Sequence, residues 1–76
     1  MNRIRRKNLQ SIIDQLEELK SSLEELQEEE EEYRDNMPEN LQGSERYEKA
    51  DEACDNLYEA VSSLEEAIDS IGAAIE

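Results

Sequence analysis

Residues 35–43 read Asp-Asn-Met-Pro-Glu-Asn-Leu-Gln-Gly, and this stretch decides how the chain folds. It contains the only proline and the first of the two glycines. Proline cannot continue a helix, because it lacks an amide hydrogen and its ring clashes with the preceding turn. Gly43 followed by Ser44 is typical of a turn and a new helix N-cap. We therefore predict a loop over residues 36–43 between two helices.

The sequence before the loop carries an apolar heptad pattern. Its steps alternate between three and four residues, through Leu9, Ile12, Leu16, Leu19, Leu23 and Leu26, and the register continues at Glu30, Tyr33 and Met37. This is the a/d repeat of a coiled coil. It predicts a first helix over residues 3–35.

The sequence after the loop repeats the pattern and predicts a second helix over residues 44–75. Its seam consists of Tyr47, Ala50, Cys54, Leu57, Val61, Leu64, Ile68, Ile71 and Ile75. A short connection makes neighbouring helices antiparallel, in a register that places Leu16 opposite Leu64 and Leu19 opposite Val61. The expected fold class is all-α, with residues 1–76 forming a single antiparallel two-helix coiled-coil hairpin.

A column of small residues lies beside the seam of the second helix. Its members repeat at heptad spacing: Ala53, Asn56, Ala60, Ser63, Ala67, Ser70 and Ala74. Small side chains let another helix approach closely, so we expect a homodimer that pairs through this column into a four-helix bundle, with the first helix outside. The alternative is an exposed face where alanine serves helix formation.

Charge and composition narrow the possible partners. The 76 residues contain 8 Lys plus Arg, 22 Asp plus Glu and no histidine, for a net charge of −14. Such a charge disfavours direct binding to nucleic acid or anionic membrane and favours a basic protein. No apolar run approaches the ~20 residues of a membrane span. The single cysteine, Cys54, fits a reducing cytoplasm and is interpreted as a small core residue.

Few residues suit catalysis. Without histidine and with one cysteine the chain has no thiolate–imidazole set for zinc, and its carboxylates lack an evident pocket that would shift their pKa. We therefore expect no enzyme activity, no cofactor and no metal.

The acidic residues are the candidate binding surface. An unbroken run covers Glu28 to Glu32, and the residues expected to contact a partner are Glu24, Glu25, Glu28, Glu29, Glu31 and Glu32, with Tyr33, Met37 and Leu41 at the tip. A dimer would approach the charge density of duplex DNA, which is about one charge per ~1.7 Å. This suggests a DNA mimic that inhibits a nucleic-acid-binding protein. The alternative is a structural or assembly coiled coil whose charge only confers solubility, with the tip residues forming a small core.

The basic N-terminal segment is the exception to the acidic pattern. Arg3, Arg5, Arg6 and Lys7 would lie beside the end of the second helix in a hairpin. We expect them to form ion pairs with acids there, such as Glu66 and Asp69.

The stretch from Met37 to Ala50, following an acidic heptad helix, resembles small acidic helical-hairpin proteins of Firmicutes and their phages or mobile elements. The resemblance implies a bacterial cytoplasmic location, or the host cytoplasm for a phage-encoded protein. It carries over no catalytic residue and favours the inhibitor hypothesis.

Overall fold

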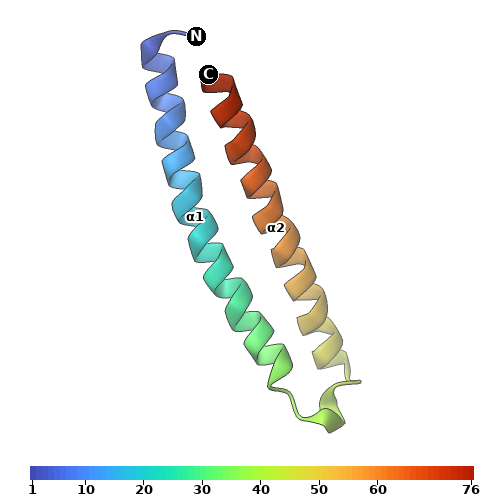
Figure 1. Ribbon diagram of the computed structural model, residues 1–76. Coiled ribbons are helices and arrows are strands. Elements are labelled where there is room, and N and C mark those ends of the chain that lie inside the picture. The colour runs from blue at the N-terminus through green and yellow to red at the C-terminus, as the bar shows by residue number, and fades with distance from the viewer.

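The computed structural model describes residues 1–76 as two long helices joined by a short loop. Helix α1 spans Arg3–Asp35, η1 is one turn of 3-10 helix over Glu39–Leu41, and α2 spans Glu45–Ile75. The two long helices lie antiparallel, with both termini at one end and the loop at the other (Figure 1). The molecule is a rod of 59 × 15 × 12 Å. The predicted all-helical hairpin is confirmed.

Each long helix begins at a side chain that caps its backbone. The Arg5 amide donates to Asn2 Oδ1 at 2.7 Å, and the Tyr47 amide donates to Ser44 Oγ at 3.3 Å. These bonds satisfy amide groups that the first turn of a helix leaves without an internal partner. Ser44 is thus the N-cap that the sequence indicated, whereas Asn2 was not foreseen.

The α2 half of the seam is buried as predicted. Ala50, Cys54 and Val61 are buried, and every other predicted position is half-buried: Tyr47, Leu57, Leu64, Ile68, Ile71 and Ile75. Only five residues of the chain are buried in all, the other two being Ile13 and Met37. The core is therefore a single thin layer between the helices.

The α1 half of the seam differs from the prediction. One predicted set lies outside the interface, with exposed fractions of 44 % for Ile12, 61 % for Leu19, 56 % for Leu26 and 48 % for Tyr33. The residues that follow them in the sequence are buried or half-buried instead: Ile13, Lys20, Gln27 and Arg34. The packed face of α1 is thus turned by roughly half of the 100° that separates successive helical residues. The layer of Leu19 against Val61 was wrong.

Two ion pairs bridge the helices on this turned face. Lys20 Nζ lies 3.0 Å from Glu65 Oε1, and Arg34 Nη1 lies 2.9 Å from Asp51 Oδ1. Both basic side chains can cover apolar surface with their methylene stems while the charged ends reach carboxylates. Burying Leu19 and Tyr33 instead would move these two cations away from α2, in a chain that has few others.

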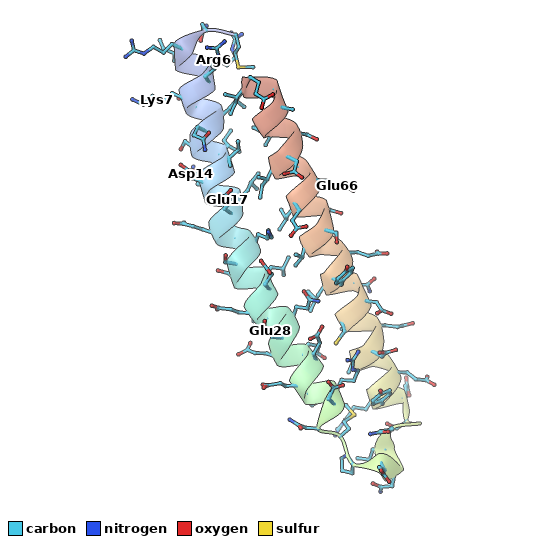
Figure 2. The ribbon with its side chains drawn as sticks, in the orientation of Figure 1. Arg6, Lys7, Asp14, Glu17, Glu28 and Glu66 are labelled. Atoms are coloured by element: carbon cyan, nitrogen blue, oxygen red, sulfur yellow. The ribbon has the colours of Figure 1, made fainter.

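The N-terminal segment does not form the predicted ion pairs. None of Arg3, Arg5, Arg6 and Lys7 lies within ion-pair distance of a carboxylate. Lys7 points away from α2 (Figure 2). Lys7, Asp14 and Glu28 are separated by multiples of seven residues, so their side chains lie on the same side of α1. This side faces away from α2.

Candidate functional site

The acidic run forms a continuous surface on α1, which we call the acidic face. Its six residues line one shallow hollow that no hydrophobic residue borders: Glu25, Glu28, Glu29, Glu31, Glu32 and Asp35. Spacings of three and four residues make these carboxylates neighbours on the helix surface. Figure 2 shows Glu28 on this part of α1, with Glu66 on the other helix. The structure therefore brings most of the predicted acidic contact residues together on one helix.

Most of the acidic face has no neutralising partner. Asp35 pairs with Arg34 at 3.0 Å, and Glu31 accepts a hydrogen bond from Gln27 at 3.3 Å. Glu25, Glu28, Glu29 and Glu32 form no ion pair. The remaining predicted acid, Glu24, lies outside this hollow and is 4.0 Å from Lys20.

Arg34 does not neutralise the rest of the face. Its guanidinium is held by Asp35 on one side and by Asp51 of α2 on the other. These interactions, led by the hydrogen bond with Asp35, raise the pKa of Arg34 above its usual value. The cation closest to the acidic face is therefore already paired, and the free carboxylates can engage an outside cation without breaking an ion pair.

The three predicted contact residues at the tip differ in accessibility. Tyr33 is 48 % exposed and Leu41 is 38 % exposed, whereas Met37 is only 7 % exposed. Met37 packs inside the tip, as in the alternative of a small core at the hairpin end. Its burial argues against direct contact with a partner, while Tyr33 and Leu41 remain available.

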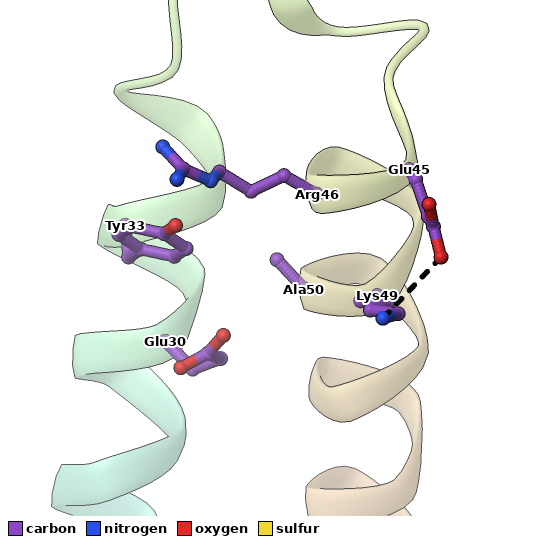
Figure 3. Close-up of a pocket in the computed structure, with 6 residues that line it drawn as sticks. All are labelled: Glu30, Tyr33, Glu45, Arg46, Lys49 and Ala50. Carbon is purple, nitrogen blue, oxygen red and sulfur yellow. Dashed lines mark ion pairs between the residues drawn. The ribbon is translucent and has the colours of Figure 1, made fainter.

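A second hollow lies beside the tip, between the two helices. Tyr33 and Glu30 of α1 line it together with Arg46 and Ala50 of α2, and Glu45 and Lys49 complete its wall. Arg46 reaches across toward α1 in Figure 3, while Lys49 turns to Glu45 at 3.3 Å. Glu30 thus sits near cations at this interface but forms no ion pair with them.

An apolar surface that sequence reasoning missed lies along the same edge of the hairpin. Tyr33 and Arg46 share the second hollow, and Arg46 is seven residues before Ala53, so it begins the small-residue column of α2. The exposed column of α1 therefore borders the small-residue column of α2. We call these residues the apolar face: Ile12, Leu19, Leu26 and Tyr33 of α1 with Ala53, Ala60, Ala67 and Ala74 of α2. The ion pairs of Lys20 and Arg34 lie on the opposite edge.

The seven residues predicted to form the dimer face differ in exposure. Ala53 and Ala60 are half-buried beside α1, whereas Ala67 and Ala74 are exposed. The remaining three, Asn56, Ser63 and Ser70, lie farther from α1 and are also exposed.

The only signal in the sequence for the apolar face is the pair of consecutive isoleucines, Ile12 and Ile13. Either of them can occupy the seam, and heptad counting alone cannot decide which one turns inward.

Cys54 lies in the core. Its side chain is 4 % exposed, and burial raises the pKa of the thiol. A buried thiol with a raised pKa is mostly protonated near neutral pH and reacts slowly. This environment fits the interpretation of Cys54 as a packing residue.

No group of three or more His, Cys, Asp or Glu side chains is arranged to hold a metal ion. Neither helix is long and apolar enough to cross a membrane. Comparisons with protein families, with curated proteins and with solved structures find no significant match to this chain.

Proposed function

We propose that the protein is a non-enzymatic binding module whose acidic face engages a basic protein, of the class that binds nucleic acids. The observation that carries this proposal is the set of four unpaired carboxylates on the acidic face, at Glu25, Glu28, Glu29 and Glu32. Like charges at these spacings destabilise a helix. Their concentration without cations is what a surface for a basic partner requires.

The charge density supports a DNA-mimic mode of binding. Two hairpins together would carry twice the net charge of −14 along a rod 59 Å long. This is about one negative charge per ~2 Å, against one per ~1.7 Å in duplex DNA. We propose that such a pair occupies a nucleic-acid-binding cleft in the cytoplasm of a bacterium or a phage-infected host, and thereby inhibits the protein that owns the cleft.

The exposure of all polar residues to solvent supports the non-enzymatic part of the proposal. No polar or charged residue is buried. Catalytic carboxylates usually need a pocket that shifts their pKa toward the working pH, and the hollows here are shallow and open.

A competition experiment tests the proposal. Purified basic nucleic-acid-binding proteins are loaded with fluorescent duplex DNA, and the chain is added at several salt concentrations. We expect it to displace DNA from at least one of them, with an affinity that falls steeply as salt rises. Substituting Gln at Glu25, Glu28, Glu29 and Glu32 should abolish displacement.

The matched control removes the same charge from α2, with Gln at Glu52, Glu59 and Glu66 and Asn at Asp55. This control should retain displacement. If it fails as completely as the α1 variant, the acidic face is not the binding surface and only the total charge matters.

One observation favours a second candidate, a structural or assembly coiled coil whose charge serves solubility. The apolar face leaves four large side chains exposed at heptad spacing, between 44 % and 61 %. A chain that retains its cellular role when the acidic face is neutralised, and loses it when Leu19 and Leu26 are replaced, would belong to this class.

A further inference from the structure

The apolar face is bordered by uncharged residues on both sides. On α1, the residues next to the exposed column are polar and uncharged along most of its length: Asn8, Gln15 and Ser22. On α2, the residues beyond the alanine column are also uncharged: Asn56, Ser63 and Ser70. In a chain of which 39 % is charged, a charge-free surface this long needs an explanation. The border becomes charged only toward the tip, at Glu29 of α1 and Lys49 of α2.

The absence of charge indicates what can bind there. A basic partner gains most from the acidic face, where the unpaired carboxylates lie, and gains little from a surface without charge. A second copy of this chain carries the same −14, so it can approach only where few like charges would meet. The apolar face is the side that satisfies this condition.

We propose that two copies pair through the apolar face about a two-fold axis that runs along the rod. This operation places α1 of each hairpin over α2 of the other, so that the large column meets the small column. Leu26 then enters the space between Ala53 and Ala60 of the second copy. Leu19 and Ile12 enter the next two spaces along the same column. Each helix in the resulting four-helix bundle is antiparallel to its neighbours.

The dimensions of the face suit a stable pair. It follows a rod 59 Å long and 15 Å wide, which is enough to supply the ~800 Å² per partner of a standard interface. Alternating large and small residues across the interface lets the layers interdigitate. Turning one hairpin end for end would instead set leucine against leucine and alanine against alanine, leaving gaps beside the alanines.

Pairing would also give the chain a thicker core than one hairpin has. No side chain of the hairpin is fully buried, and chains of this size bury too little surface to be robust alone. Covering Ile12, Leu19, Leu26 and Tyr33 adds four large side chains to the core, about one for every two turns of this part of α1. In this arrangement α1 is part of the interface, in contrast to the expected bundle with the first helix outside.

Analytical ultracentrifugation of the wild-type chain and two variants tests the pairing. The wild-type chain should form dimers at tens of micromolar, and replacing Leu19 and Leu26 by Ser should weaken the dimer at least tenfold while circular dichroism shows the helices intact. Tyr58→Ser is the matched control, because Tyr58 is 64 % exposed on the opposite edge. A wild-type chain that stays monomeric at several hundred micromolar, or a Tyr58 variant that weakens the dimer equally, would overturn the proposal.

Ala67→Leu tests the arrangement of large over small residues. The substitution adds apolar surface to an exposed position without lowering helix propensity, so a face that binds only by hydrophobicity would dimerise more tightly. In the proposed bundle the new side chain fills the space into which Leu19 or Ile12 must enter, and the dimer should weaken several-fold. Tighter dimerisation contradicts the interdigitated geometry.

Cross-linking fixes the orientation of the two copies. In a Cys54→Ala background, Leu26→Cys mixed with Ala60→Cys should give abundant cross-linked dimers with a short bismaleimide, whereas neither variant alone should. Leu19 lies at the middle of α1, so efficient cross-linking of a Leu19→Cys variant to itself would show that α1 lies over α1 end for end and would refute the proposed axis.

Salt separates this inference from the proposed function. Two chains of −14 repel each other, so their pairing should tighten as salt screens the repulsion. Binding of the acidic face to a basic protein should weaken over the same range. Self-association that weakens with added salt counts against an apolar interface, whatever the outcome of the competition with DNA.

Discussion

Lys20 of α1 lies 3.0 Å from Glu65 of α2 and occupies a place at the helix interface where Leu19 was expected. The hydrogen bond to Glu65 is the main reason that the pKa of Lys20 is raised above its ordinary value of 10.5. A raised lysine pKa means that the folded state favours the charged form. The stability that this contributes is present below pH 10.5 and is lost as the pH rises through the folded-state value.

Reversing the charge of Lys20 should therefore destabilise the hairpin. Lys20→Glu places a carboxylate next to Glu65, Glu17 and Glu24, so we expect the melting temperature to fall by roughly several degrees in low salt. Lys20→Met keeps the stem that covers the interface and should have a much smaller effect. Thermal melts followed by circular dichroism provide the measurement. Equal losses for both substitutions would mean that the ion pair contributes nothing specific.

The neighbouring isoleucines provide a direct test of the turned interface. Ile13 is 6 % exposed and Ile12 is 44 % exposed, although heptad counting placed Ile12 in the seam. Ile13→Ala should cost about 2–4 kcal/mol of unfolding free energy, and Ile12→Ala less than about 1 kcal/mol. Urea titrations at low micromolar concentration, below the tens of micromolar at which the proposed dimer should form, measure both. If Ile12→Ala costs more unfolding free energy than Ile13→Ala, the seam predicted from the sequence is the correct one.

The hairpin could be predicted from sequence because its signals are local and redundant. Pro38 and Ser44 mark the turn, and the apolar residues of α2 all agree on one face. The rotation of α1 could not be predicted, because Ile12 and Ile13 are chemically equivalent and heptad counting cannot choose between them. The acidic face was visible as a run of glutamates, whereas the apolar face required knowledge of which leucines are left outside.

Cys54 should report the opening of the hairpin. Because burial raises the pKa of its thiol above the ordinary value of 9.0, alkylation by iodoacetamide at pH 8 should be at least tenfold slower than in urea. Glu59→Cys in a Cys54→Ala background provides an exposed thiol on the outer side of the same helix and should react at the rate of the unfolded chain. Fast labelling of folded Cys54 would show that the core layer opens freely.

The same thiol has a consequence for stability at high pH. The folded chain holds the thiol proton more tightly than the unfolded chain, so the unfolded state ionises first as the pH rises. Stability should therefore decline from about pH 9 upward until the folded-state thiol also ionises. Cys54→Ala should remove this part of the decline, and a wild-type profile that matches the variant above pH 9 would contradict the raised pKa.

Gly72 is a position where stability can be added. It lies within α2, and a Cβ built there would meet no atom within 4 Å. Gly72→Ala should stabilise the chain by about 0.5–1 kcal/mol, because alanine restricts the unfolded chain and favours the helix. Thermal or urea unfolding measures the gain. A loss of stability would mean that the end of α2 packs against atoms that the isolated hairpin does not contain.

Neutralising the acidic face should separate stability from function. Gln at Glu28, Glu29 and Glu32 removes like charges at neighbouring helical positions, and these residues form no ion pairs that would be lost. We expect the melting temperature to rise by a few degrees in low salt and by less in high salt, where repulsion is already screened. The same variant should lose displacement of DNA from basic proteins. A surface that is retained only for solubility would show the gain in stability without the loss of binding, whereas a face that costs stability and also binds is maintained for its partner.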